Sequence, residues 1–160
     1  MSKKSKGTPD SGPRDLATNR QARFKYHLLD KWEAGIILQG SEVKSLRDGK
    51  VNLKDSYATI RDGEVFLHSM HIAPYGPAAG EQHEPERTRK LLLHRREIDR
   101  LIGKTKESGL TVIPTRIYFK GSNAKVEIAL AKGKDLHDKR QSIKEREQKR
   151  EMDRAIKDRY

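Results

Sequence analysis

The 160 residues of this chain include no cysteine. The side chains that could carry chemistry are therefore its histidines, its carboxylates and its basic groups. His68 and His71 resemble a metal-binding pair, but residues three apart on a strand point to opposite faces and cannot share an ion. Acidic pairs such as Glu84 and Glu86 stand in polar segments, which lack the burial that makes a carboxylate an acid at neutral pH. We therefore predict that the chain has no metal site and no cofactor, and that it is not an enzyme.

The basic residues form a more informative pattern. Asn19, Arg20 and Arg23 lead directly into the first strand-like segment, where a folded barrel would aim both arginines at phosphate groups. The segment Thr88-Arg89-Lys90 precedes a run of three leucines in the same way. The alternative is that each group is a solvated basic edge that keeps a strand from aggregating.

The overall charge favours a polyanionic partner. The formal net charge is +12, and residues 1–25 carry 7 basic and 2 acidic groups while residues 131–160 carry 11 and 7. The two ends therefore hold +5 and +4, which leaves +3 for residues 26–130. A near-neutral body with two basic arms is typical of nucleic-acid binders and, less often, of proteins held on anionic membranes. Because only 6% of the residues are aromatic, we expect recognition of folded RNA by shape and backbone rather than by a base-stacking sheet.

The compartment follows from what the sequence lacks. The N-terminal segment is basic but has no apolar stretch of the kind found in signal peptides. No run approaches the ~18 apolar residues of a membrane span, and the absence of cysteine suits a reducing compartment. We expect a soluble, cytoplasmic protein without a membrane partner.

Hydrophobic periodicity predicts a mainly β fold. Two short helices are expected among five or six strands, with a tight turn at Asp62-Gly63 and an edge or bulge position for Pro114. The expected elements are strands over 24–38, 51–61, 64–72, 110–120 and 125–130 and helices over 41–49 and 91–103. This set fits a closed antiparallel β-barrel of the oligonucleotide-binding type, with two or three short helices. We assign residues 1–18 to a disordered basic arm, 19–130 to the barrel and 131–160 to a basic tail.

The tail lacks the apolar stripe with which an ordinary helix docks on its own core. Its large hydrophobic residues are Leu136, Ile143, Met152, Ile156 and Tyr160. We therefore predict that the tail is disordered, or becomes helical only against a polyanionic partner.

Several motifs in fixed order resemble the SmpB family of SsrA-binding proteins. They are NRQARFKY, WEAGIILQGSEVKSLRDGKVNLKDSYA, RDGEVFL, TRKLLLHRREID and AKGKDLHDKRQSIKERE, extending from about Asn19 to Glu151. The resemblance implies an oligonucleotide-binding-type barrel that binds transfer-messenger RNA and brings it to ribosomes stalled on messages without a stop codon. It further implies contact with rRNA of the small ribosomal subunit and with elongation factor Tu in the delivery complex, and no role for DNA.

The resemblance also implies roles for individual residues. Glu33 matches an acidic residue that supports binding of the tRNA-like domain, and Leu92 with His94 matches a second patch linked to that RNA. Basic positions around the RNA and at the tail root are matched by Arg20, Arg23, Lys132 and Lys134, with Asn19 opening the same motif. The segment that enters the decoding region is matched by His137, Asp138, Lys139 and Arg140.

The sequence departs from the family pattern at three of these regions. His94 replaces what is more often asparagine, a better helix N-cap. Asp135 replaces a residue that is often basic, and Gln148 stands where an aromatic residue is common. Two other functions stay open beside the implied one: a structural component of the ribosome with similar basic arms, and, less favoured by the site search, a nucleic-acid-processing enzyme.

Overall fold

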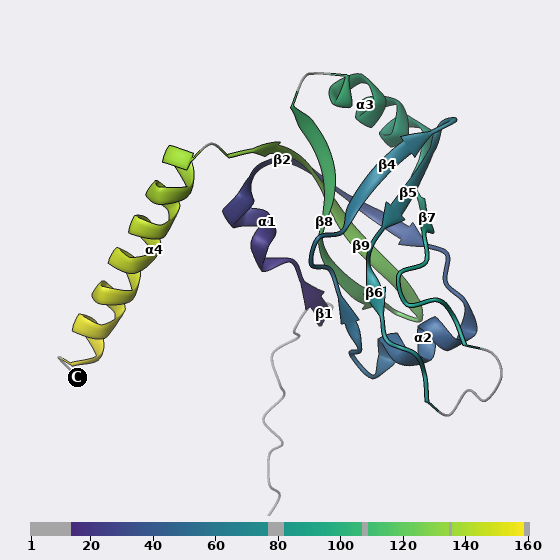
Figure 1. The fold of residues 1–160 in the computed structure, drawn as a ribbon, viewed down its shortest axis with the longest axis horizontal. Coiled ribbons are helices and arrows are strands. Elements are labelled where there is room, and N and C mark those ends of the chain that lie inside the picture. The colour runs from purple at the N-terminus through teal and green to yellow at the C-terminus, as the bar shows by residue number, and fades with distance from the viewer. Residues whose placement is uncertain (1–13, 77–81, 107–108, 135, 159–160) are drawn as a thin grey trace, which may run out of the picture.

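The computed structural model describes residues 14–76, 82–106, 109–134 and 136–158, with the side chains of residues 136–138 outside that description (Figure 1). In chain order the elements are β1 (Asp15–Thr18), α1 (Arg20–Lys25), β2 (Tyr26–Ile36), α2 (Gly40–Arg47), β3 (Val51–Asn52), β4 (Tyr57–Arg61), β5 (Glu64–His68), β6 (His71–Ile72), β7 (Arg89–Leu92), α3 (Arg95–Thr105), β8 (Leu110–Lys120), β9 (Asn123–Gly133) and α4 (Leu136–Lys157).

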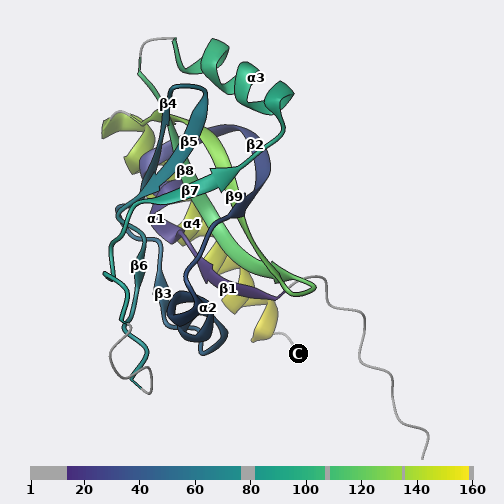
Figure 2. The ribbon, with the colours of Figure 1, turned by 90° about the vertical axis from the view of Figure 1, so that its right-hand side faces the viewer.

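The large sheet closes on itself, which confirms the predicted antiparallel barrel. Its strand order is β1-β8-β4-β5-β7-β2-β9, and β9 pairs back onto β8, with every pairing antiparallel. Closure removes the unpaired edges that would invite aggregation. β3 and β6 form a separate two-stranded ribbon. Figures 1 and 2 show α2 and α3 at opposite ends of the barrel, with α4 projecting away from it.

Side chains on the inner faces of the strands fill the core of the barrel. On the first half of β9, Val126 and Ile128 are fully buried while their neighbours Lys125 and Glu127 face outward, and the later residues Ala129, Leu130 and Ala131 are all buried. The two end helices contribute apolar residues to the same core, among them Leu46 of α2 and Leu101 of α3, both fully buried. The outer faces of β2, β8 and β9 therefore remain free to display charged side chains.

The tight turn and the bulge are where the sequence placed them. Asp62 and Gly63 have φ of 51° and 73°, the left-handed pair that a two-residue hairpin turn needs, and they join β4 to β5. The pairing of β8 with β9 shifts register between Pro114 and Arg116. Asn19 holds this bulge, because its backbone N–H donates to the Thr115 carbonyl at 2.7 Å and its Nδ2 donates to the Pro114 carbonyl at 3.0 Å.

Several predicted boundaries are wrong. The strands expected over 51–61 and 64–72 are each divided, the first into β3 and β4 and the second into β5 and β6. Residues 15–18, assigned to a disordered arm, form β1 on the edge of β8, and α1 replaces the expected start of the first strand. Leu91, expected in a helix, lies in β7 opposite Val65, because a short apolar run fits a buried strand as well as a helix. The tail was expected to begin at Ala131, but Ala131 is fully buried and β9 continues to Gly133.

A buried ion-pair cluster ties α2 to β7. Arg89 is fully buried, and its Nε donates to Glu42 Oε2 while its Nη1 donates to the Met70 carbonyl at 2.6 Å. Arg87 donates to the other oxygen of Glu42 at 2.6 Å. Burial opposes ionisation of Glu42, but hydrogen bonds from the Gln39 backbone and from both arginines prevail and lower the pKa of its carboxyl group. Arg89 is therefore not available to a phosphate group. The prediction that the basic side chains of residues 88–90 face phosphates is wrong for Arg89.

Candidate nucleic-acid interface

Glu33 stands on the outer face of β2 as a fixed, ionised carboxylate. Its side chain is 39% exposed, Tyr118 Oη donates to its Oε2, and Lys120 Nζ lies 3.3 Å from its Oε1. The hydrogen bond from Tyr118 is the main cause that lowers the pKa of Glu33. Burial, together with that same hydrogen bond, raises the pKa of Tyr118 to about 12. At neutral pH the pair is therefore a carboxylate and a neutral phenol.

Leu92 is brought beside Glu33 by strand register. Gly35 pairs with Leu92 of β7 on one side and with Lys125 of β9 on the other. Glu33 and Gly35 are two residues apart on β2 and therefore lie on the same face of the sheet. The side chains of Glu33, Leu92 and Lys125 thus share the outer face of the barrel. A Cβ at Gly35 would lie only 3.3 Å from the Leu92 Cβ, so glycine lets the two strands carry Leu92 at this position. Leu92 is 50% exposed, which leaves an apolar side chain beside a charged one.

His94 lies just beyond, at the N-cap of α3, as the spacing to Glu97 predicts. Its backbone N–H donates a hydrogen bond to Glu97 Oε2 at 3.1 Å, as in a capping box. The residue itself is exposed. The neighbouring arginines of α3 extend this edge of the surface and line the same hollow as His94; they are Arg95, Arg96 and Arg100. Sequence reasoning missed these arginines, although the Arg-Arg pair after the leucine run was a visible signal.

Arg116 organises the part of the outer face next to β1. Its Nε donates to Glu127 Oε2 at 2.8 Å, and its Nη1 donates to Asp15 Oδ1 at 3.0 Å. Its guanidinium also lies 4.6 Å from the centroid of the Tyr118 ring. We call the outward residues of these strands the barrel face: Lys31, Glu33, Leu92, Arg116, Tyr118, Lys120, Lys125 and Glu127. Except for Glu33 and Leu92, these residues were not among the predicted site residues.

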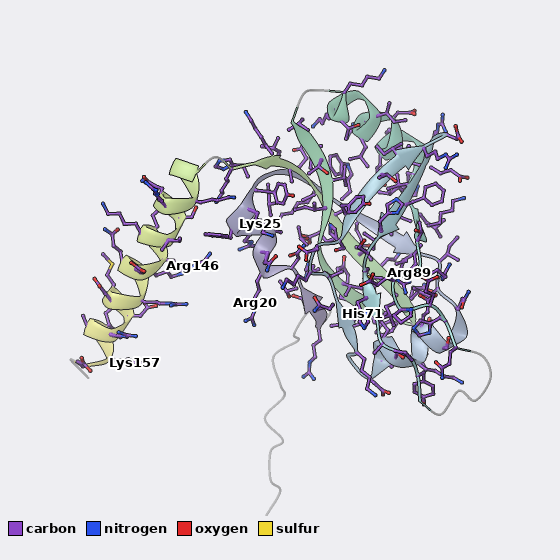
Figure 3. The ribbon with its side chains drawn as sticks, in the orientation of Figure 1. Arg20, Lys25, His71, Arg89, Arg146 and Lys157 are labelled. Carbon is purple, nitrogen blue, oxygen red and sulfur yellow. The ribbon has the colours of Figure 1, made fainter. Side chains whose placement is uncertain are left out.

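A cavity of about 490 Å³ joins the barrel face to α1. Its lining includes the predicted Asn19, Arg20 and Arg23 together with Lys31 and Arg116. Arg20 and Arg23 are exposed, and Figure 3 shows Arg20 extending from the start of α1 away from the barrel. The side chain of Asn19 is instead engaged with the β8 bulge. The structure thus gathers two predicted arginines with two cations of the barrel face.

Lys134 joins three segments at the root of the tail. Its backbone N–H donates to the Lys25 carbonyl at 2.9 Å, and its Nζ donates to the Arg23 carbonyl at 2.9 Å and to Ser142 Oγ at 2.8 Å. Lys132, one pleat earlier on β9, is exposed opposite His27. Of these two predicted residues, Lys132 is open to a ligand while Lys134 connects α1, β9 and α4.

The tail forms a helix, α4, that packs on little besides α1. The Arg146 guanidinium lies 5.9 Å from the Phe24 ring, and Figure 3 shows Arg146 on the side of α4 that faces α1. The apolar side chains of α4 are exposed: Ile143 by 42%, Met152 by 68% and Ile156 by 58%. The tail is thus helical in this structure, whereas the sequence predicted disorder or a helix formed only against a polyanionic partner, and these three apolar side chains join no core.

The predicted decoding-region residues occupy the first turns of α4. Lys139 is partly buried and Arg140 is exposed, and Gln148 is exposed further along. His137 and Asp138 belong to α4, but their side chains lie outside the described residues, as does Asp135 entirely. Figure 1 places α4 and α3 on opposite sides of α1 and the β8–β9 pair, so the tail helix stands apart from α3.

The described part of the chain holds neither a three-ligand metal cluster nor a membrane-spanning helix. Within it, no group of three His, Cys, Asp or Glu side chains could hold a metal ion. His68 and His71 differ in setting, since His68 contacts the Thr59 and Thr88 hydroxyl groups while His71 is exposed. No helix in the described ranges is long and apolar enough to cross a membrane.

Comparison with known proteins gives one consistent family. The model described as "SmpB protein" matches residues 16–158. The SsrA-binding protein of Carboxydothermus hydrogenoformans is 54% identical over 145 residues, covering 91% of this chain and 97% of the relative. That of Trichodesmium erythraeum is 54% identical over 158 residues, covering 98% and 99%. A solved chain described under "tmRNA-SmpB: a journey to the center of the bacterial ribosome" superposes with a TM-score of 0.64 at 48% identity, over 75% of this chain and 85% of that one.

Proposed function

This chain belongs to the SmpB protein family, and from that membership we propose that it binds transfer-messenger RNA and acts with it on ribosomes in trans-translation. The observation that carries the proposal is a family match over residues 16–158, which includes both the barrel face and the tail. The relatives are SsrA-binding proteins over nearly their whole length. The fold supports the proposal independently, because it gathers four basic side chains, with the carboxylates of Asp15 and Glu127, around one cavity beside α1.

The barrel face with α1 is the surface proposed to bind the tRNA-like domain. Arg20, Arg23 and Lys132 are exposed cations that suit phosphate groups. Glu33 cannot favour a phosphate, but its carboxylate can accept a hydrogen bond from a ribose hydroxyl or a base N–H group. It also holds Tyr118 and Lys120 in position. Leu92 and the edge near His94 supply apolar and basic contact beyond it.

The tail is proposed to occupy the empty mRNA channel and the decoding region of the small subunit. α4 carries exposed basic side chains and, among its described side chains, no buried apolar face, so rRNA phosphate groups would supply the countercharge that it lacks in the free chain. The residues proposed to reach the decoding region are His137, Asp138, Lys139 and Arg140. Lys134 would set the direction in which α4 leaves the barrel.

The same proposal includes partners and a compartment. We assign the chain no catalysis of its own, a cytoplasmic location, and elongation factor Tu as a partner in the delivery complex. What supports a non-catalytic role is that the carboxylates of the barrel face pair with cations and stay ionised. Burial opposes ionisation of Glu127, but the hydrogen bonds from Arg116 and Thr115 lower its pKa.

A gel-shift comparison tests the function. The full chain should bind transfer-messenger RNA more tightly than ordinary tRNA or small-subunit rRNA fragments at one fixed salt concentration, since phosphate contacts weaken steeply with ionic strength. Equal affinity for the rRNA fragments, with copurification on every ribosome, would favour the structural ribosomal component instead. Binding to none of the three RNAs would sink the proposed function.

A further inference from the structure

Tyr57, at the start of β4, is an exposed aromatic ring on a rigid support. It is 44% exposed and pairs across the strands with His68 of β5. The two rings are stacked, with centroids 5.1 Å apart and planes inclined by 20°. His68 is in turn held at both ring nitrogens, by Thr59 Oγ1 at 2.7 Å and Thr88 Oγ1 at 3.3 Å. Because one face of Tyr57 is covered by this held imidazole, the ring is preorganised as a stacking surface.

Tyr57 lines a cavity of about 260 Å³ against α1. His68 does not line this cavity, whereas Gln21, Lys25 and Tyr26 do. The volume is below the roughly 300–1,000 Å³ of pockets that take drug-sized ligands, which suits a group as small as one nucleobase. We call this cavity, between Tyr57 and α1, the Tyr57 slot.

Two polar groups of the Tyr57 slot lack a strong partner. Gln21 Oε1 is one of two buried side-chain polar atoms in the described residues without a hydrogen-bond partner, which costs free energy unless a donor is supplied. Lys25 Nζ lies 3.7 Å from Asp55 Oδ1, with side chains 44% and 68% exposed. An exposed pair of this kind contributes little, so Lys25 can turn to a phosphate while Asp55 remains in solvent. Figure 3 shows Lys25 at the end of α1 next to the barrel.

We propose that the Tyr57 slot binds one unpaired nucleobase of the RNA, a site that rests on the proposed function and adds a base contact to it. The base stacks on the free face of Tyr57, an N–H of its edge donates to Gln21 Oε1, and Lys25 pairs with an adjoining phosphate. Every nucleobase has an aromatic face and an N–H donor, so the slot selects an extruded base rather than a particular sequence. The low aromatic content of the chain is compatible with this role, since a single supported ring is enough.

Substitution of Tyr57 tests the proposal in the full chain. Tyr57→Ala should weaken binding of transfer-messenger RNA about tenfold at fixed salt, as expected for the loss of one base stack. Tyr57→Phe keeps the ring and should bind within about twofold of the unsubstituted chain. The matched control is Ile37→Ala, at a residue 47% exposed that does not line the slot. Unchanged affinity in Tyr57→Ala would overturn the slot and leave the proposed function intact.

Ultraviolet crosslinking of the unsubstituted chain to transfer-messenger RNA gives a second test that needs no variant. Mass spectrometry should find a nucleotide adduct on Tyr57 or Tyr26. Adducts confined to other peptides would overturn the slot. Failure of the unsubstituted chain to bind the RNA at all would instead count against the proposed function, so the two failures are distinguishable.

Discussion

The barrel face and α4 both display basic side chains, but they support them in opposite ways. On the barrel face, Arg116 is fixed by two carboxylates and the Tyr118 ring, and Glu33 is fixed by a phenol and an amine. On α4, the contacts between described side chains and the rest of the chain include the Arg146–Phe24 ring contact and the Lys134–Ser142 hydrogen bond at its root. The same charge is therefore held on a rigid surface in one region and on a lone helix in the other.

This difference suggests two kinds of binding. A preorganised surface binds folded RNA with little further loss of conformational freedom. From residue 139 onward α4 has no buried apolar stripe, and an (i, i+4) pair such as Glu145 with Lys149 contributes only about 0.2–0.5 kcal/mol to a helix. Its helix is therefore sensitive to its surroundings, as suits a segment that is proposed to enter a channel lined by phosphate groups.

The largest expected effect is on the free energy of unfolding of the barrel. Glu42→Ala leaves Arg89 buried without its carboxylate, which should cost about 3–5 kcal/mol of unfolding free energy. Urea unfolding followed by Trp32 fluorescence measures it, with the exposed Glu84→Ala as control. A loss below about 1 kcal/mol would contradict the view that this pair holds α2 to β7.

Acidification should separate the two regions next. Glu33, Glu42 and Glu127 have lowered pKa values in the folded chain, so they stabilise it above the unfolded carboxyl pKa of about 4.3 and lose that contribution as pH falls through their folded values. Barrel stability should thus fall steadily below about pH 5. Tyr118 acts in the opposite pH range. Its pKa is raised to about 12, so the folded chain favours the neutral phenol, and this contribution to stability is lost as pH rises from about 10 through about 12. Unfolding midpoints that stay constant from pH 5 to pH 3 would refute the predicted loss of stability in acid.

Glu33→Ala should weaken binding of transfer-messenger RNA about tenfold, since it removes an acceptor and frees Tyr118 and Lys120. Glu33→Gln keeps an acceptor and should lose less. Gel shifts at fixed salt compare both with Glu64→Ala, an exposed carboxylate on β5 that pairs with Lys90. Equal affinity of Glu33→Ala and the unsubstituted chain would remove Glu33 from the site.

The smallest effect concerns the anchoring of the tail. Phe24→Ala removes the ring under Arg146 and should lower barrel stability by less than about 1 kcal/mol, the usual size of an exposed cation–ring contact. Helical circular dichroism should fall more than the barrel unfolding midpoint. A large loss of barrel stability would mean that α4 is part of the folded core.

Local patterns predicted much of the barrel and little of its surface network. The Asp62-Gly63 turn, the Pro114 bulge and the N-cap at His94 depend on neighbours in sequence, and the structure confirms all three. The Tyr118–Glu33 contact joins positions 85 apart, so it follows from strand register that periodicity does not set. Burial of Arg89 was missed for the same reason, because its partner Glu42 lies on another element.

The central claim is that the barrel captures the RNA and the tail serves the ribosomal step. Truncation after Lys134 tests it most directly, because β9 ends at Gly133 and the cut leaves the barrel strand complete. The truncated chain should bind transfer-messenger RNA within about threefold of the full chain, since the exposed cations of α1 and β9 and the barrel face remain. It should fail to support peptide tagging on stalled ribosomes. Loss of RNA binding together with tagging, or tagging that persists without α4, would contradict the account.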